Sequence, residues 1–326
     1  MSDSRQLSID FDDWDFQERP VTPASADVRA ASMRAAVSDP SREPLVYISF
    51  GSGSSGNSCY IGTKAGGVIV DAGVNSDQIE AALKVNGIPM SHVKGLCLTH
   101  DHTDHVKFAY KLLRANKHLR LFCTNRVLNA ILRRHSISKR IKDYHVPIFK
   151  EFPFMLAGFE VTAFDVPHDA ADNAGFCFRY ADKTFVMATD LGEVSERARF
   201  YMSQADFLMI EANYDLHMLQ WGPYPEYLKA RIRTDHGHLD NTDTATFVAS
   251  IAGGAEPVNP RLRYIFLCHL SQDNNTPEKA VGAVRSALEE AGLTVGDASD
   301  PLEASACRLQ LMALPRFAPT RLFHLR

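Results

Sequence analysis

Short apolar runs recur along the chain from residue 45 to residue 314, and most of them have the length of a β-strand. Residues 45–50, 59–62 and 67–70 are rich in β-branched and aromatic side chains, which predicts three strands that open the fold as a β-meander. Apolar runs of the same kind predict further strands at 93–98, 152–156, 159–166, 175–180, 184–189, 206–211, 263–267 and 307–314.

Helices are expected where apolar residues recur every three to four positions. Residues 76–86 carry such a stripe, which includes Ile79 and Leu83, and the stripe ends at Asn86-Gly87. Similar patterns predict helices at 106–115, 225–233, 242–252 and 276–291. This mixture of strands and helices, without a repeat of solenoid length, indicates a layered α+β fold.

One boundary divides the 326 residues. Residues 1–43 are polar and lack periodicity, and acidic residues such as Asp12 and Asp13 alternate there with aromatic ones such as Trp14. We expect a disordered acidic tail over 1–43 and one folded domain over 44–326. The tail could instead be a short peptide that docks on a partner protein or on the chain's own basic face.

Cysteine usage and the absence of a signal-peptide pattern bear on the compartment. None of the six cysteines forms a C-x-x-C pair, and several lie in apolar runs such as 96–98, where small buried side chains are expected. We therefore expect a reduced, cytoplasmic protein. No apolar run approaches the ~18 residues of a membrane helix, so no membrane association is expected.

The densest group of potential metal ligands directly follows the apolar run 93–98. The segment 100–105 reads His-Asp-His-Thr-Asp-His. Neutral imidazole and carboxylate are metal ligands, and this density within one loop predicts a metal site. His100 and His102 can point at one ion, while Asp104 and His105 reach a second.

Three further ligand-type residues stand where an apolar strand meets its loop. They are His168, Asp190 and His269. Singly, each is more often an ordinary polar residue at a strand end. Together with the 100–105 segment they supply seven ligands, which suits two metal ions that share one carboxylate.

A strongly basic segment follows the histidine-rich loop. Residues 107–150 hold twelve Lys and Arg residues and one acidic residue, Asp143, although the whole chain has a net charge of -4. A polyanion binds such a surface with strong salt dependence, whereas a small neutral substrate does not need it. A solvated pair of helices is the alternative. The candidates for phosphate contacts are Arg126, Arg133, Arg134, Lys139 and Arg140. No motif predicts base recognition.

Other polar residues are weaker candidates for substrate contacts. The Gly/Ser-rich loop 51–58, with Ser54, Ser55 and Asn57, could direct backbone N–H groups and hydroxyls toward an anion, or it could be a flexible hairpin turn. Asn213 is a further candidate. His238 could protonate a leaving oxygen, or it could be a surface histidine or a partner of a metal ligand.

The order of these ligands resembles the metallo-β-lactamase superfamily. The pattern His100-x-His102-x-Asp104-His105, followed by the three strand-end ligands, covers residues 45–314. The resemblance implies a four-layer αββα sandwich with the site at the edge where the two sheets open. It implies one metal on His100, His102 and His168, and a second on Asp104, His105 and His269. It further implies that Asp190 bridges the two ions and that Asp71 supports the histidine loop.

A narrower resemblance is to the YycJ (WalJ) branch, and it rests on residues 51–58, 211–215, 237–241 and 269–275. It implies a DNA exonuclease linked to repair. The superfamily branch acting on cyclic ribose phosphates is expected to lack the second and third of these segments. The long extra domain of the cleavage-factor-type nucleases has no room between Asp190 and Ile210.

These observations predict a metallo-hydrolase that cleaves phosphodiester bonds in nucleic acid, with DNA as the expected substrate. It would use two divalent ions, zinc or manganese with iron as a further candidate. A metal-bridging hydroxide would attack phosphorus, Asp104 and Asp190 would orient it, and His238 would donate a proton. Two alternatives stay open: a cyclic phosphodiesterase or thioesterase of the same fold, and a metal-dependent regulator without catalysis, against which the complete ligand set argues.

Overall fold

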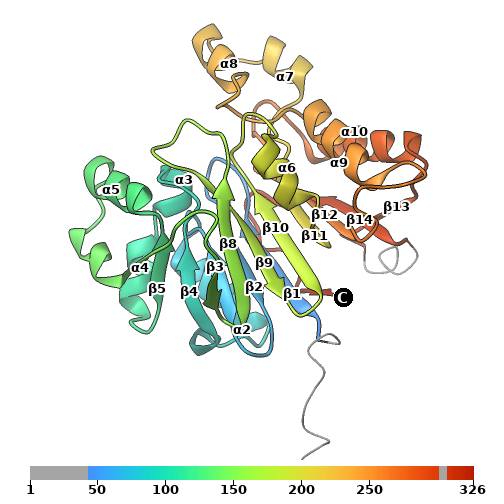
Figure 1. Ribbon diagram of the computed structural model, residues 1–326. Coiled ribbons are helices and arrows are strands. Elements are labelled where there is room, and N and C mark those ends of the chain that lie inside the picture. The colour runs from blue at the N-terminus through green and yellow to red at the C-terminus, as the bar shows by residue number, and fades with distance from the viewer. Residues whose placement is uncertain (1–42, 301–306) are drawn as a thin grey trace, which may run out of the picture. The chain divides into compact units, whose positions relative to one another are not determined.

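Two β-sheets packed face to face form the centre of the fold (Figure 1). The computed structural model describes residues 43–300 and 307–326. The tail predicted over 1–43 lies outside the described residues, except for its last residue. Its disorder and its boundary therefore stay predictions.

The first sheet has the strand order β15-β1-β2-β3-β4-β5-β6. Strands β1 to β3 form the predicted meander, and β3 to β6 run parallel. The bounds of its strands are β1 (Leu45–Gly51), β2 (Ser58–Gly62), β3 (Gly67–Val70), β4 (Val93–Cys97), β5 (Arg120–Cys123), β6 (His145–Pro147) and β15 (Phe323–Leu325).

The second sheet has the order β13-β14-β12-β11-β10-β9-β8-β7. Strands β7 to β10 are antiparallel neighbours, and β10, β11, β12, β14 and β13 run parallel. Its strands are β7 (Phe154–Leu156), β8 (Phe159–Asp165), β9 (Ala174–Tyr180), β10 (Lys183–Ala188), β11 (Phe207–Glu211), β12 (Tyr264–Cys268), β13 (Val295–Asp297) and β14 (Leu309–Ala313).

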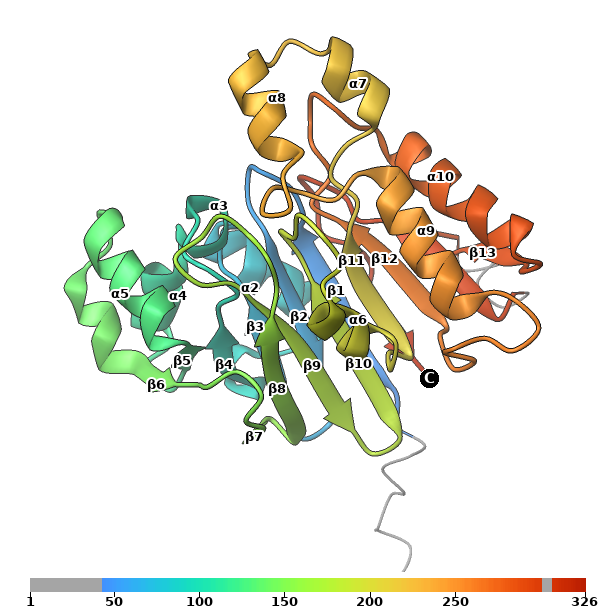
Figure 2. The same ribbon diagram turned by 45° about the horizontal axis from the view of Figure 1, so that its top comes forward.

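Helices cover the outer face of each sheet. Those on the first sheet are α2 (Ser76–Val85), α3 (Thr103–Val106), α4 (Ala109–Ala115) and α5 (Asn125–Arg134). Those on the second are α6 (Glu196–Met202), α9 (Asn241–Ala252) and α10 (Pro277–Glu290). Two more, α7 (Leu216–Trp221) and α8 (Glu226–Ile232), stand away from both sheets (Figure 2).

Three apolar cores correspond to these layers. One lies between the sheets, where the Tyr47 ring of β1 packs 5.1 Å from Phe185 of β10 and 4.8 Å from Phe266 of β12. The other two lie between each sheet and its helices. The predicted αββα sandwich is confirmed. None of the helices among the described residues has the length and apolar content needed to cross a membrane.

The helix expected over 106–115 is two helices, α3 and α4. The backbone N–H of Phe108 donates to the carbonyl of Ala72, outside the helix, at 2.8 Å. This bond interrupts the helical ladder between the two segments. The pattern gave no bounds for α5 and did not predict β5, β6, β13, β15, α6 and α7.

Strand direction explains where the predicted ligands meet. Strands β8, β10, β11 and β12 all run the same way, so their carboxyl ends share one edge of the second sheet. His168, Asp190 and His269 follow β8, β10 and β12. In the first sheet β4 leads into the loop 98–102 and α3.

Candidate metal centre

One group of imidazoles converges where the 100–105 loop meets the residues after β8. The ligand atoms of His100, His102 and His168 all lie within 4.8 Å of one another. Nδ1 of His102 lies 3.3 Å from Nε2 of His168. This is the group that the resemblance implies for one metal ion.

A second group lies beside the first. Ligand atoms of Asp104, His105 and His269 also lie within 4.8 Å of one another. Oδ2 of Asp104 is 3.3 Å from Nε2 of His269 and 3.6 Å from Nε2 of His105. The loop after β12 and the start of α3 therefore bring together the second implied set.

Asp190 lies between the two groups. Its Oδ2 is 3.1 Å from Nε2 of His105, and its Oδ1 is 3.2 Å from Nδ1 of His269 and 3.8 Å from Nε2 of His168. This carboxylate, 1% exposed, reaches donors of both sets, as a bridging ligand must.

The donor set fits divalent metal ions. Nε2 of His100 is buried and has no hydrogen-bond partner within the described chain, although a buried polar atom left unpaired is costly. It belongs to both the His102/His168 group and the His105/Asp190 group. A metal ion would satisfy it, and imidazole with carboxylate suits Zn, Mn and Fe.

Hydrogen bonds on the far ring nitrogens orient the candidate ligands. Nδ1 of His105 lies 2.8 Å from Oδ2 of Asp71, whose other oxygen accepts the Thr99 N–H at 2.9 Å. Nδ1 of His168 lies 3.0 Å from the carbonyl of Gly237. Each contact leaves Nε2 directed to the centre, the arrangement that such partners impose on metal-binding imidazoles.

Backbone strain marks the ends of three strands at this site. Asp71, Asp190 and His269 have φ angles of 59°, 54° and 52°, a region that residues other than glycine rarely adopt. Such conformations persist where surrounding contacts fix them, and they cluster at functional sites. Here each one follows β3, β10 or β12 directly or after one residue.

The buried charges are balanced around the centre. Burial alone lowers the pKa of His269, but the carboxylates of Asp190, Asp104 and Glu211 outweigh it and raise that pKa to about 10. Burial alone also lowers the pKa of His105, but the neighbouring carboxylates outweigh burial and raise that pKa above its ordinary value. A divalent cation bound among these carboxylates would neutralise their charge in place of the imidazole protons. Metal binding therefore releases protons and strengthens as the pH rises.

Glu211, at the end of β11, is a site residue that sequence reasoning missed. Its fully buried carboxylate accepts the backbone N–H of Leu191 at 2.9 Å and of Leu239 at 3.3 Å. It also lies 2.7 Å from Nδ1 of His269 and 2.8 Å from Nδ1 of His238. The available signal was an acid at the end of an apolar strand, inside the 211–215 segment that carries the family resemblance.

The structure places His238 beside the centre. Its ring lies 5.1 Å from the His168 ring and 5.2 Å from the His269 ring. Nδ1 is held by Glu211, and the side chain is 19% exposed. His238 is therefore fixed on one side and open to solvent on the other. Its role as a proton donor stays a prediction.

Two asparagines predicted to bind substrate contact candidate ligands. Nδ2 of Asn57 lies 3.1 Å from Oδ2 of Asp104 and 3.0 Å from Nε2 of His105. Nδ2 of Asn213 donates to the carbonyl of His269 at 2.7 Å. Both side chains are buried. These contacts favour a role in positioning the ligands.

The Gly/Ser-rich loop 51–58 divides into a buried and an exposed part. Ser54 and Ser55 are exposed, and their contact with a substrate stays a prediction. The hydroxyl of Ser52 is buried and accepts the His269 N–H at 2.9 Å. The loop therefore supports the centre from beneath and presents two serines outward.

The predicted arginines differ in their contacts with the metal loop. Arg134, at the end of α5, pairs with Asp101 of the histidine loop at 3.1 Å. Arg133 is exposed and forms no ion pair among the described residues, and Arg140 is 3.8 Å from Asp143. The basic segment thus touches the metal loop through Arg134. In the described chain, eight of its cations have no ion pair: Lys107, Arg114, Lys117, Arg120, Arg126, Arg133, Lys139 and Lys142.

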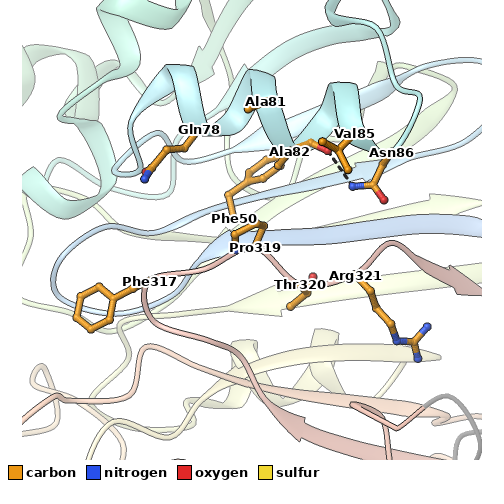
Figure 3. Close-up of a pocket in the computed structure, with 10 residues that line it drawn as sticks. All are labelled: Phe50, Gln78, Ala81, Ala82, Val85, Asn86, Phe317, Pro319, Thr320 and Arg321. Carbon is orange, nitrogen blue, oxygen red and sulfur yellow. Dashed lines mark hydrogen bonds between the residues drawn. The ribbon is translucent and has the colours of Figure 1, made fainter.

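Pockets lie on more than one side of the fold. One of about 460 Å³ runs between α2 and residues 317–321, with Phe50 at its base, and none of the seven candidate ligands lines it (Figure 3). Another, of about 410 Å³, is lined by His238 with Arg199 and Arg233. Only the second adjoins the centre.

Comparisons with known proteins agree with this fold. Residues 67–257 match the family model described as the beta-lactamase superfamily domain. The solved structure of YhfI, a metallo-beta-lactamase fold protein of Bacillus subtilis, superposes with a TM-score of 0.58 at 12% identity, covering 86% of this chain and 99% of that one. Zn²⁺-bound PqqB of Methylobacterium extorquens superposes with a TM-score of 0.54 at 14% identity, covering 86% and 100%. The chain belongs to the metallo-β-lactamase superfamily, whose fold implies divalent metal binding.

Two relatives narrow this assignment. The chain is 33% identical over 253 residues to exodeoxyribonuclease YycJ of Bacillus anthracis, which covers 76% of this chain and 90% of the relative. It is also 33% identical over 252 residues to exodeoxyribonuclease WalJ of Streptococcus pneumoniae serotype 2, with 77% and 90% covered. Within the superfamily it is a YycJ/WalJ-like member, a metallo-hydrolase of the nuclease or phosphodiesterase type.

Metal removal should destabilise the fold. Chelation followed by thermal unfolding is expected to lower the Tm by roughly 5–15 °C, because the ions bind only the folded state. The difference should shrink as the pH falls, since protons then compete for His105 and His269. Metal analysis first verifies that the chelated protein holds no metal. If its Tm then equals that of the metal-loaded protein across pH 6–8, the site is contradicted.

Proposed function

We propose that the protein is a DNA exonuclease that uses two divalent metal ions, held by the seven residues that converge at the sheet edge. The observation that carries the proposal is the pairing of a complete two-ion donor set with a neighbouring surface of unpaired cations. The names of the YycJ and WalJ relatives support the choice of DNA and of exonucleolytic cleavage. A role in repair is part of the same proposal.

The ions would be held as two sets that share Asp190. His100, His102 and His168 form one, and Asp104, His105 and His269 form the other. Zinc and manganese suit these donors, and iron is a further candidate. Divalent ions at such a site polarise a phosphoryl oxygen and supply a nucleophilic hydroxide at neutral pH.

The chain's own residues then orient the nucleophile and donate a proton to the leaving group. Asp190 is almost fully buried, so its carboxylate is fixed, while the side chain of Asp104 is 22% exposed and faces the open side. His238 is anchored through Nδ1 by the buried Glu211, which leaves Nε2 free to donate a proton to a leaving oxygen. The geometry supports Asp104 and Asp190 as orienting groups and His238 as the acid.

The basic surface supports a polyanionic substrate. Arg134 contacts the histidine loop, and the unpaired cations of segment 107–150 lie on α4 and α5 (Figure 1) and on the segments that precede, join and follow them. Each phosphate neutralised there releases counterions, so binding should fall steeply with salt. The free state of all six cysteines supports the proposal of a reducing compartment such as the cytoplasm.

The test is an end-labelled cleavage assay with single- and double-stranded DNA and RNA and with Mn²⁺ or Zn²⁺ added. Shortening of DNA from one end by the wild type, and no cleavage by His102→Ala, would support the proposal. Absence of cleavage of every end structure with every metal would sink it. Faster hydrolysis of RNA than of DNA would reassign the substrate.

The basic surface has its own readout. Arg126→Gln/Arg133→Gln/Lys139→Gln should reduce the slope of log binding constant against log salt by about 2–3, since each lost phosphate contact removes about 0.9. Lys84→Gln/Lys94→Gln, which removes exposed charges beside α2 and β4, is the control and should leave the slope unchanged. A wild-type slope near zero would favour a small phosphodiester instead.

A further inference from the structure

Residues 216–232, which include α7 and α8, form a helical arm. The proposed hydrolysis assigns no role to this arm. The arm is inserted between Glu211 and His238, both of which contact the centre. It has a small core of its own, in which Leu219 and Ile232 are buried with Tyr214. It is therefore an ordered projection, standing above the sheet edge (Figure 2).

Direct contacts tie the base of the arm to the metal centre. Nε of Arg231 lies 2.5 Å from Oδ2 of Asp169, and Oδ1 of Asp169 lies 3.4 Å from Nε2 of His168. The backbone N–H of His238 donates to the carbonyl of Ile232 at 2.9 Å. The base of the arm therefore borders the metal centre.

The tip of the arm carries two exposed aromatic rings. Trp221, at the end of α7, is 73% exposed, and Tyr227, in the first turn of α8, is 77% exposed. They are the two most exposed of the described Phe, Tyr and Trp side chains. Exposed rings of this size at the facing ends of two successive helices are typical of a binding surface.

The tip provides ring surface but little free charge. Lys229 is paired with Glu226 at 3.0 Å, and Arg231 is paired with Asp169. Further unpaired cations among the described residues are Arg233, directly after α8, and those of segment 107–150. This division suits unpaired nucleic acid, whose bases stack on aromatic rings while its phosphates follow a cationic surface. In a duplex the base faces are covered and cannot reach the rings.

We propose that Trp221 and Tyr227 stack on unpaired bases next to the scissile phosphate, so that the enzyme holds its substrate as a single strand at the metal centre. This inference rests on the proposed nuclease function and specifies its substrate form. The arm then selects single-stranded ends, or ends that can fray, over closed duplex.

Fluorescence of Trp221 tests the proposal directly. The chain has two tryptophans, so Trp14→Phe leaves Trp221 as the only one. The metal-loaded full chain is titrated with a phosphorothioate oligothymidine, which resists cleavage, and with a phosphorothioate blunt duplex that has no unpaired loop. We expect saturable quenching by the single strand and much weaker quenching by the duplex, in which only the two terminal pairs expose a base face. Unchanged emission in a protein that cleaves DNA would overturn the inference and leave the proposed function standing.

Binding by variants provides a second readout. Trp221→Ala/Tyr227→Ala should weaken single-strand binding about 30-fold or more, because each stacked base contributes roughly 1–3 kcal/mol. Trp221→Phe/Tyr227→Phe should restore most of the affinity. Phe152→Ala, which removes a ring that is 70% exposed just before β7, is the matched control and should bind like the wild type.

Two outcomes would reassign the rings. If the alanine pair bound DNA normally but changed a dimer into a monomer in sedimentation, the rings would belong to an interface with a second copy, and the proposal would be wrong. If the wild type bound no oligonucleotide and cleaved none in the end-labelled assay, both this inference and the proposed function would fail.

Discussion

Asp190→Asn is expected to lower DNA hydrolysis by at least about 10³-fold and to reduce the metal content of the purified protein from two ions to one or none. The carboxylate lies within 3.8 Å of His105, His168 and His269, and it therefore reaches both donor sets. A neutral amide offers one weak donor oxygen and turns an NH₂ group toward imidazoles. This change in rate corresponds to the loss of several kcal/mol of the transition-state stabilisation that the metal ions supply.

The matched control for this variant is Asp165→Asn. Asp165 is also at the end of a strand, β8, but its side chain is 66% exposed and it pairs with Lys150. The control should keep two ions and activity within about twofold of the wild type. Metal is counted by mass spectrometry and hydrolysis by release of end label. If Asp190→Asn retained both ions and full activity, the shared-carboxylate assignment would be wrong.

The candidate ligands could be predicted from sequence because each one combines a metal-binding side chain with a strand end. His168, Asp190 and His269 follow apolar runs, and parallel strands bring such positions to one sheet edge. The αββα architecture followed from the order of these motifs and the family resemblance. Glu211 has the same sequence signature. Its role in holding two imidazoles could not be predicted, because these lie 27 and 58 residues further along the chain.

Loop contacts were harder to predict for the same reason. Asn57 lies in a loop whose composition suggests an anion cradle, yet its amide contacts Asp104 and His105, which are 47 and 48 residues away. Composition reports the flexibility of a loop and not its neighbours in space. The arm was also missed in part, because α7 spans only Leu216–Trp221 and is capped locally by Asp215. Six residues give too little periodicity to identify a helix.

Glu211→Gln is expected to weaken metal binding and hydrolysis by about 10- to 100-fold, the range typical for partners that orient metal-binding imidazoles. Both Nδ1 contacts of the carboxylate, to His238 and His269, are charge-assisted, and an amide cannot accept all of its present hydrogen bonds. The amide keeps one oxygen, so either the two imidazoles or the buried N–H groups of Leu191 and Leu239 lose their acceptor. We therefore expect the free energy of unfolding to fall by about 1.5–3 kcal/mol.

The pH dependence separates a positioning role from a merely structural one. Burial alone raises the pKa of Glu211, but His238 and His269 outweigh it and hold that pKa below its ordinary value. The ionised carboxylate therefore stabilises the wild type at neutral pH, and this stabilisation disappears as the pH falls through the lowered pKa. The stability gap between wild type and Glu211→Gln should close in acid. In addition, the pH–rate profile should change on the limb that reports the proton donor, because His238 loses its anchor. A variant with lower stability but an unchanged pH–rate profile would limit Glu211 to a structural role and leave His238 positioned by other contacts.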